Sequence, residues 1–368
     1  MGVFIHQLER WPNFQWDEKK LYPLLNEVRH QQGKLLGRME RIGFGLQSEA
    51  TLQTLTLDVL KSGEIEGELL DAEQVRSSIA RRLGMDIAGM VTADRHVEGI
   101  VEMMVDATQH FEKPLAEERL FGWHAALFPT GRSGMHKIVA GNWRDNPSHD
   151  PMQVVSGPMG KETVHYEAPA AELLPDEMNR FLHWFNSAKD TDPVLKAAIA
   201  HIWFVTIHPF DDGNGRIARA VADMQLARAD GTAQRFYSMS AQIRKERNAY
   251  YDILEKTQKG NLDITEWLEW FLQCLHRAMN ASEEILSAVL KKAAFWKVHE
   301  KTIFNKRQVL LLNKLLDGFD GKLTSSKWSM IAKCSQDTAL RDIQDLAEKK
   351  VLLKEVGGGR STSYILAV

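Results

Sequence analysis

Thirteen residues, Ile207 to Arg219, read Ile-His-Pro-Phe-Asp-Asp-Gly-Asn-Gly-Arg-Ile-Ala-Arg and separate two helices of different character. The segment before them, 197–207, is apolar nearly all round, which is typical of a buried helix. After them, apolar residues recur at helical spacing: Ile217, Ala220, Val221, Met224 and Ala227. We therefore expect a polar loop between a buried helix and a second helix that begins near Arg216.

The backbone of this loop is suited to binding phosphate. Gly213 and Gly215 allow sharp turns and the close approach of a ligand. The N–H groups of Gly213, Asn214 and Gly215 can form a concave nest at a helix N-terminus, an arrangement that binds anions. Because Arg216 and Arg219 are three residues apart, they share one helix face and can grip two phosphates, or one phosphate bidentately.

Two other side chains of the loop can carry chemistry. Asp212 directly precedes the nest, where a carboxylate can hold Mg²⁺ that bridges a polyphosphate. His208 is the one side chain here that can take a proton near neutral pH. Taken singly, each residue also fits an ordinary solvated turn with a capping Asp and a core His. Other phosphate loops fit less well, because a Walker loop needs Gly-Lys-Ser/Thr and the Rossmann fingerprint needs a preceding strand.

The loop resembles the signature of the Fic family, His-x-Phe-x-Asp/Glu-Gly-Asn-Gly-Arg-x-x-Arg, and every fixed position of that pattern is present from His208 to Arg219. The resemblance implies a nucleotidyltransferase, most simply a protein adenylyltransferase that moves AMP from ATP to a hydroxyl group of a target protein. ATP would dock on the glycine nest with Mg²⁺ on Asp212, and Arg216 and Arg219 would hold its β and γ phosphates. His208 would take the proton of the attacking hydroxyl.

A second motif lies upstream, where residues 62–67 read Ser-Gly-Glu-Ile-Glu-Gly. It matches the Ser/Thr-x-x-x-Glu-Gly/Asn motif of the family's inhibitory helix and lies in a segment, about 51–84, that we expect to form one or two helices. The resemblance implies that Ser62, Glu66 and Gly67 are regulatory, with Glu66 paired to Arg219 in place of the terminal phosphate. The alternative is a solvated acidic turn, since Glu64, Glu66, Glu68 and Asp71 form a charge run.

Two further regions would complete a nucleotide site. Residues 152–169 read as two short strands about a turn at Gly157–Gly160, after a segment, 129–150, that we expect to be loop. The family carries a hairpin flap at this place, whose edge would pair with the target backbone. By the same resemblance, seven residues would contact the nucleotide: Val154, Val155, Ser156, Gly157, Tyr250, Tyr251 and Gln258. Because adjacent helix residues point about 100° apart, one Tyr of the pair can reach the adenine while the other packs in the core. A surface hairpin without a role in binding is the alternative for the flap.

The last part of the chain, 291–368, differs in charge from the rest. It holds 15 Lys and Arg against 8 Asp and Glu, whereas the whole chain has a net charge of −3. Three helical patterns followed by a hairpin around Gly357–Arg360 resemble a winged helix-turn-helix, with 336–349 as the recognition helix. Such a domain binds DNA in some proteins and serves as a dimerisation or docking module in others.

Composition indicates an ordinary globular protein. The two cysteines, Cys274 and Cys334, do not form a disulfide framework, which together with the absence of a signal-like N-terminus predicts a cytoplasmic protein. The longest apolar run is about eleven residues, too short to cross a bilayer, so no membrane partner is expected. The family often regulates through dimers, which makes a homodimer an expectation.

The predicted fold is mainly α, with three domains. Residues 1–112 would form a helical N-terminal domain, residues 113–290 a Fic-type helical core with a β-hairpin flap, and residues 291–368 the winged-helix domain. Three other functions stay open at this point. The same loop could remove AMP or transfer another phosphate-containing group. The chain could instead be a DNA-binding regulator with a nucleotide-sensing core, or an interaction scaffold.

Overall fold

The computed structural model describes residues 3–87, 89–147, 149–157, 161–187, 190–319, 321–355 and 362–367. It is mainly helical, as the sequence predicts, and it divides into two compact units. The first unit comprises Met1–Met85 and Val91–Glu283, and the second comprises Asp86–Met90 and Glu284–Val368. The expected division of the first unit near residue 112 stays a prediction.

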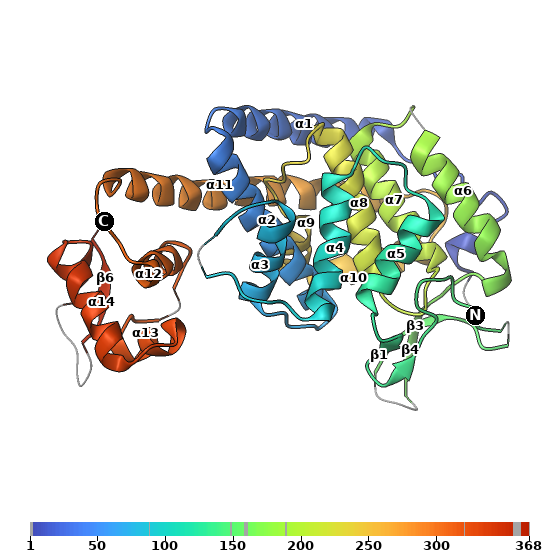
Figure 1. Cartoon of the computed structure of the whole chain (residues 1–368). Helices are drawn as coiled ribbons and strands as arrows, with labels where there is room; N and C mark the ends of the chain where they lie inside the picture. Colours follow the sequence, from blue (N-terminus) through green and yellow to red (C-terminus); the bar gives the residue numbers. More distant parts are fainter. Residues whose placement is uncertain are drawn as a thin grey trace. The chain divides into compact units, whose positions relative to one another are not determined.

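The first unit contains eleven of the described α-helices and two of the short antiparallel sheets (Figure 1). Its elements are η1 (Ile5–Gln7), α1 (Glu18–Glu40), α2 (Phe44–Ile65), α3 (Ala72–Arg82), α4 (Arg95–Gln109), α5 (Glu117–Leu127), β1 (Arg132–Ser133), β2 (His136–Lys137), β3 (Gln153–Ser156), β4 (Thr163–Glu167), η2 (Ala171–Leu173), α6 (Leu174–Ser187), α7 (Pro193–Ile207), α8 (Asn214–Asp230), α9 (Met239–Lys245), α10 (Arg247–Gln258) and α11 (Thr265–Val298), which continues into the second unit.

Helices α7 and α8 form the centre of the first unit. Every residue of α7 from Val194 to Ile207 is buried, which explains why its sequence lacks a polar face. The helix begins at Asp192, whose carboxylate accepts the N–H groups of Val194 and Leu195, and Pro193 occupies its first turn. Helix α8 packs along α7 and also against α2, α4 and α5 (Figure 1). The polar loop that joins α7 to α8 is therefore held by the core on several sides.

The segment expected to form an inhibitory helix is two helices with a break between them. Helix α2 ends at Ile65 and α3 begins at Ala72, so Glu66 caps α2 instead of lying inside a helix. Gly67 has a φ of 84°, a left-handed conformation that glycine adopts at little cost and that reverses the chain. Helix α2 packs against α9 and α3, which places this break beside the core helices.

The region 129–150 is not all loop. Residues Arg132–Ser133 and His136–Lys137 pair as the antiparallel strands β1 and β2, a hairpin that the sequence analysis missed because each strand has only two residues. The expected flap hairpin is present as β3 and β4, with a register shift between Val154 and Val155. Residues 158–160 of its predicted turn lie outside the described residues.

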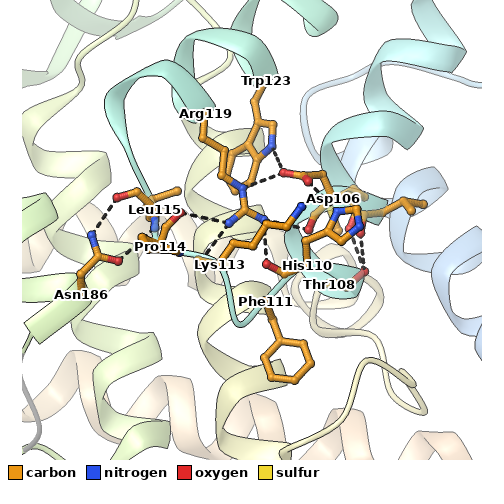
Figure 2. Close-up of polar contacts among 12 residues, drawn as sticks. Asp106, Thr108, His110, Phe111, Lys113, Pro114, Leu115, Arg119, Trp123 and Asn186 are labelled. Carbon is orange, nitrogen blue, oxygen red and sulfur yellow. Dashed lines mark hydrogen bonds and ion pairs between the residues drawn. The ribbon is translucent and has the colours of Figure 1, made fainter.

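A polar cluster fixes the connection between α4 and α5 (Figure 2). The carboxylate of Asp106 accepts hydrogen bonds from Arg119 Nε at 2.7 Å and from Trp123 Nε1 at 2.8 Å. The same guanidinium donates to the Asp106 carbonyl in the last turn of α4 and to the carbonyls of His110, Lys113 and Pro114, which follow that helix. Because the carbonyls of His110, Lys113 and Pro114 lie beyond the end of α4, Arg119 satisfies acceptors that the helix itself cannot. The cluster orients α5, whose His124 and Phe128 pack against the loop between α7 and α8.

The second unit has its own apolar core. Its elements are α12 (Lys306–Leu316), α13 (Ser325–Ala332), α14 (Gln336–Glu348), β5 (Leu352–Lys354) and β6 (Tyr364–Leu366). Buried residues from the three helices, the first strand and the residues just before α13 and β5 make the core: Leu311, Leu312, Leu323, Trp328, Ala339, Ile343, Leu346, Val351 and Leu352. The glycine-rich segment expected at the tip of the hairpin, Gly357–Arg360, lies outside the described residues, and the winged-helix assignment stays a prediction.

Two smaller sequence expectations concern membranes and cysteines. Across the described ranges, we find no helix that combines the length and the apolar character needed to span a bilayer. Cys274 and Cys334 are both free thiols.

The buried imidazole of His201 in α7 should make the stability of the protein depend on pH. Burial lowers the pKa of His201 to about 3, and the charge of Arg219 acts in the same direction. The unfolded chain therefore binds a proton at this residue that the folded chain does not, between the ordinary pKa of about 6.5 and the folded value. The free energy of unfolding should fall as the pH falls through this window, by up to about 1.4 kcal/mol per pH unit for this group.

We expect His201→Phe to reduce that slope in urea unfolding measured at pH 7, 6 and 5. His183→Phe is the matched control, because this residue is exposed on α6 and its ring meets water before and after unfolding. An equal slope in His201→Phe and the wild type would show that His201 does not contribute to acid sensitivity.

Candidate active site

A cavity of about 470 Å³ lies at the junction of the loop, the flap hairpin, α2 and α10. Nine of the residues predicted from the sequence to form the site line it: Glu66, Val154, Val155, Ser156, His208, Gly215, Tyr250, Tyr251 and Gln258. The other predicted residues, Ser62, Gly67, Gly157, Asp212, Gly213, Asn214, Arg216 and Arg219, are not part of this lining. Segments that are far apart in the sequence thus line one cavity.

His208 ends α7 and is held in a single orientation. Its backbone is left-handed, with φ 52° and ψ 58°, and its carbonyl accepts Arg144 Nε at 2.8 Å. Its Nδ1 lies 3.2 Å from the carbonyl of Val205, and because a carbonyl only accepts, Nδ1 carries the proton. Burial lowers the pKa of His208 to about 4, although the hydrogen bond to Val205 opposes that shift. At neutral pH the ring is therefore uncharged, with the lone pair of Nε2 able to take a proton.

Asn214 braces the loop from within. Its side chain accepts the N–H of Phe210 at 3.0 Å and donates to the Phe210 carbonyl at 2.7 Å, so it closes the loop across four residues. Gly213 has a φ of 79°, and a Cβ at this position would come within 2.9 Å of the Phe128 ring. A side chain would fit neither the backbone conformation nor the space. Glycine is therefore required at the entrance to α8.

Ser133 in β1 and Val139, which lies two residues after β2, contact the two aspartates of the loop. Ser133 donates a hydrogen bond to Asp212 Oδ2, and the N–H of Val139 donates to Asp211 Oδ2 at 2.8 Å. The other carboxylate oxygen of Asp212 accepts the N–H of Gly213 at 2.5 Å. One N–H of the predicted nest is thus occupied by the neighbouring carboxylate in this structure.

Arg219 is buried and paired with the segment that follows α2. Its side chain is 2% exposed, and its guanidinium donates to Glu66 Oε1 at 2.7 Å, to Ser62 Oγ at 3.0 Å and to the Ser62 carbonyl at 3.2 Å. Burial acts to lower the pKa of Arg219, but the charge and hydrogen bond of Glu66, together with Tyr250 and Tyr251, outweigh it and leave the pKa raised. The contact between Glu66 and Arg219 is the one that the sequence motif implies. Glu66 also lies over the nest, since a Cβ on Gly215 would come within 2.5 Å of its carboxylate.

Arg216 is paired as well, with a residue that the sequence analysis did not assign to the site. Its Nη1 lies 3.0 and 2.9 Å from the two carboxylate oxygens of Glu68, and its side chain is 3% exposed. The guanidinium carbon lies 5.1 Å from the centre of the Phe128 ring, within the range of a cation–π contact. Arg216 Nε and Arg219 Nη1 are buried and have no hydrogen-bond partner within the described part of the chain.

The two tyrosines of α10 occupy different environments. Tyr250 is buried and its hydroxyl lies 2.8 Å from His201 Nε2, whereas Tyr251 is 39% exposed and its hydroxyl donates to the Ile65 carbonyl at 3.4 Å. Gln258 is buried and its side-chain nitrogen has no partner among the residues that the structure describes. The cavity thus has an aromatic wall with an available hydrogen-bond donor.

A polar chain of three side chains joins the flap to α10, and no local pattern in the sequence indicates it. Ser156 Oγ lies 2.6 Å from His165 Nε2, and His165 Nδ1 lies 2.6 Å from Glu255 Oε2. His165 is in β4 and Glu255 in α10, so the three side chains connect both strands of the flap to the wall of the cavity. All three line the cavity. The separation of 90 residues between His165 and Glu255 hides this contact from any local pattern.

The comparison with known families agrees with this geometry. Residues 114–226, which include α5, the flap, α7 and the loop, match the Fic/DOC family. These residues form a Fic/DOC domain. Residues 4–85 match a separate domain of unknown function, DUF4172, and this match contains the segment with Ser62 and Glu66. The Fic/DOC domain is thus preceded by a region that has its own family.

Curated relatives and solved structures extend the comparison. The chain is 34% identical over 230 residues to "Protein adenylyltransferase Fic" of Drosophila virilis, covering 59% of this chain and 40% of that protein. It is 35% identical over 116 residues to the protein of the same name from Nematostella vectensis, covering 31% of this chain and 25% of that protein. The chain therefore spans less than half the length of these relatives.

Two crystal structures share the fold. A Fic family protein from Desulfovibrio desulfuricans matches with a TM-score of 0.51 at 21% identity, over 94% of this chain and 96% of that chain. A Fic-domain signalling protein from Bacteroides thetaiotaomicron matches with a TM-score of 0.51 at 18% identity, over 71% of this chain and 98% of that chain. At these identities the likeness concerns the fold alone.

The brace formed by Asn214 should contribute measurably to stability. Asn214→Ala leaves the buried N–H and carbonyl of Phe210 without partners, at a cost of about 2–4 kcal/mol in the free energy of unfolding. Urea denaturation followed by circular dichroism measures this cost. Asn142→Ala is the matched control, because Asn142 is exposed and, among the described residues, its side chain accepts only the N–H of its neighbour Trp143. Equal costs in the two variants would remove the assigned role of Asn214.

Proposed function

We propose that this protein is a protein adenylyltransferase, which transfers AMP from ATP to a hydroxyl side chain of a target protein. One observation carries the proposal. A cavity of about 470 Å³ brings a neutral His208, the glycine nest at Gly215 and the aromatic wall of α10 together beneath the flap. Next to it, buried guanidinium nitrogens of Arg216 and Arg219 lack partners within the described residues, as expected of groups that await phosphate. The names of the Drosophila virilis and Nematostella vectensis relatives support the same activity.

In this proposal the loop holds the phosphates. The N–H groups of Gly213, Asn214 and Gly215 would face the triphosphate, with Arg216 on the β phosphate and Arg219 on the γ phosphate. Charge neutralisation and positioning would supply most of the rate enhancement, because the reaction needs no covalent intermediate with the protein.

Asp212 is the residue that would hold Mg²⁺. Magnesium commonly binds through one or two carboxylates together with substrate phosphates and water, and Asp212 is partly exposed beside the nest. Its two carboxylate oxygens already accept hydrogen bonds from Ser133 and Gly213, which fix the orientation of the group. The ion, when bound, would neutralise charge on the phosphates.

His208 would act as the general base. Its Nδ1–H is committed to the Val205 carbonyl, so Nε2 is the atom that takes the proton. As the target oxygen forms its bond to the α phosphorus, the bond from that phosphorus to the oxygen that bridges to the β phosphate breaks. Pyrophosphate leaves, and the hydroxyl proton passes to Nε2.

The nucleoside and the target would occupy opposite sides of the flap. Tyr250, Tyr251 and Gln258 would contact the nucleoside, together with the flap residues Val154, Val155, Ser156 and Gly157. Strands β3 and β4 pair only with each other among the described residues, so an extended target segment could add to a free edge. Val155 is 49% exposed and is available for such a contact.

Glu66 would act as the inhibitor of this site, with Ser62 and Gly67 as its supports. It occupies Arg219, which the γ phosphate needs, and its carboxylate lies over Gly215. A nucleotide would then bind only by displacing Glu66 or by leaving its terminal phosphate in an unproductive position.

His208→Ala should abolish AMP transfer, with a loss of at least about a hundredfold in rate, while nucleotide binding stays within a fewfold of the wild type. Intact-mass measurement of protein substrates after incubation with ATP and Mg²⁺ measures transfer, and equilibrium dialysis measures binding. Transfer at a near-normal rate in this variant would remove His208 as the base.

Glu66→Gly should raise AMP transfer about ten- to a hundredfold, which corresponds to the 1.5–3 kcal/mol of a charge-assisted hydrogen bond. ATP labelled on the α phosphate should label the target, and ATP labelled on the γ phosphate should not. Incorporation of the γ label would instead assign phosphoryl transfer to the site. Loss of AMP from a pre-modified target in the wild type, but not in this variant, would favour the reverse reaction.

A DNA-binding role for the second unit receives little support from α14. The exposed residues of this helix are Gln336, Asp337, Leu340, Arg341, Gln344 and Glu348, which include two acidic residues and one basic residue. A helix that lies in a DNA groove needs an excess of positive charge on its exposed face. The homodimer and the cytoplasmic location stay expectations from the sequence.

A further inference from the structure

The segment that follows α2 places two carboxylates on two different arginines at the start of α8. Glu66 contacts Arg219, and Glu68 contacts Arg216 through both of its oxygens, at 3.0 and 2.9 Å. The turn at Gly67 makes this possible, because its left-handed backbone is followed by a hydrogen bond from the Glu68 N–H to the Gly63 carbonyl at 2.9 Å.

We propose that Glu68 is a second inhibitory residue, which occupies Arg216 while Glu66 occupies Arg219. With both arginines paired in this way, the cavity admits a nucleoside monophosphate, but neither arginine is available to bind the β or the γ phosphate. The inference rests on the proposed function, since it assigns Arg216 to the β phosphate and Arg219 to the γ phosphate.

Glu68 can compete with a phosphate for Arg216 because the Arg216 side chain is buried. The Arg216 side chain is 3% exposed, so its charge needs a counter-ion in any stable state of the protein. Glu68 supplies that counter-ion here, and a β phosphate would have to displace it. Glu68 is 34% exposed, so solvent weakens the pair and keeps it exchangeable.

A neighbouring helix also holds Glu68. His96, in the first turn of α4, lies with Nε2 3.4 Å from Glu68 Oε2. Burial acts to raise the pKa of Glu68, but the hydrogen bond from His96 and the charge of Arg216 outweigh it and leave the pKa lowered. The carboxylate is thus ionised at neutral pH and is directed toward Arg216 from a second element.

The residues that line the cavity are consistent with inhibition that affects binding of the β and γ phosphates and leaves binding of the nucleoside unaffected. The nucleoside end is open, with Tyr250, Tyr251 and Gln258 in the lining, whereas neither Arg216 nor Arg219 belongs to it. Removing Glu68 should therefore strengthen binding of a diphosphate and a triphosphate, and leave binding of a monophosphate unchanged.

The test compares AMP with the α,β-methylene analogues of ADP and ATP, which bind but cannot be cleaved at the reacting bond. Dissociation constants are measured by calorimetry with Mg²⁺ for the full chain and its Glu66→Gly, Glu68→Ala and doubly substituted variants. Glu64→Ala is the matched control, because Glu64 lies in the last turn of α2, close in sequence to Glu66 and Glu68, but pairs with Lys61 and Arg244. Glu68→Gln is a second variant that keeps the shape of the side chain, and thermal unfolding checks that each variant is folded.

We expect Glu68→Ala to tighten binding of both analogues about tenfold, with AMP unchanged, and Glu66→Gly to tighten only the triphosphate analogue. The double variant should bind the triphosphate analogue about a hundredfold more tightly than the wild type does, and Glu64→Ala should have no effect. Unchanged binding of the diphosphate analogue in Glu68→Ala and Glu68→Gln, with tighter triphosphate binding in Glu66→Gly, would overturn the role of Glu68 alone. Failure of both analogues to bind any variant would overturn the proposed function and this inference together.

Discussion

A buried positive charge is the constraint on which the site depends. The guanidinium of Arg219 lies at 2% exposure on the buried helix α8, and such a charge is unfavourable without an anion beside it. Glu66 provides that anion here, and in the proposed reaction a phosphate would take its place. In the proposed function, the inhibited state and the substrate-bound state each supply an anion to the Arg219 guanidinium: the Glu66 carboxylate in one and a phosphate in the other. The helix α8 that carries the arginine can stay fixed while its counter-ion is exchanged.

The sequence could predict the parts of the molecule that depend on local pattern. The all-apolar α7, the glycines at the start of α8 and the spacing of Arg216 and Arg219 are dictated by helix burial, backbone geometry and helical periodicity, and each is visible within a short window. The flap hairpin was expected for the same reason, because two short strands flank a glycine-rich turn. The contact between Glu66 and Arg219 followed from a resemblance instead, since 153 residues separate the two positions.

The sequence could not predict the parts that arise from tertiary packing. Glu68 looked like one more residue of an acidic run, and only the reversal at Gly67 brings it to Arg216. Ser133 and Val139 lay in a segment that reads as loop, yet they hold the two aspartates of the motif by hydrogen bonds. The link from His165 to Glu255 joins elements with no common pattern. In each case the contact joins residues that only tertiary packing brings together, and composition and periodicity do not predict such a contact.

The flap has a consequence for the behaviour of the purified protein. Val155 and Val164 face each other across β3 and β4 and are 49% and 40% exposed, and each strand of this ribbon has one side without a neighbouring strand among the described residues. An unpaired strand edge with exposed apolar side chains can pair with an extended segment of another polypeptide, including the same hairpin of a second copy. In concentrated samples, pairing between copies through this edge would therefore compete with the proposed binding of a target segment. The charged Lys161 lies near the end of the hairpin and is the kind of residue that disfavours such aggregation.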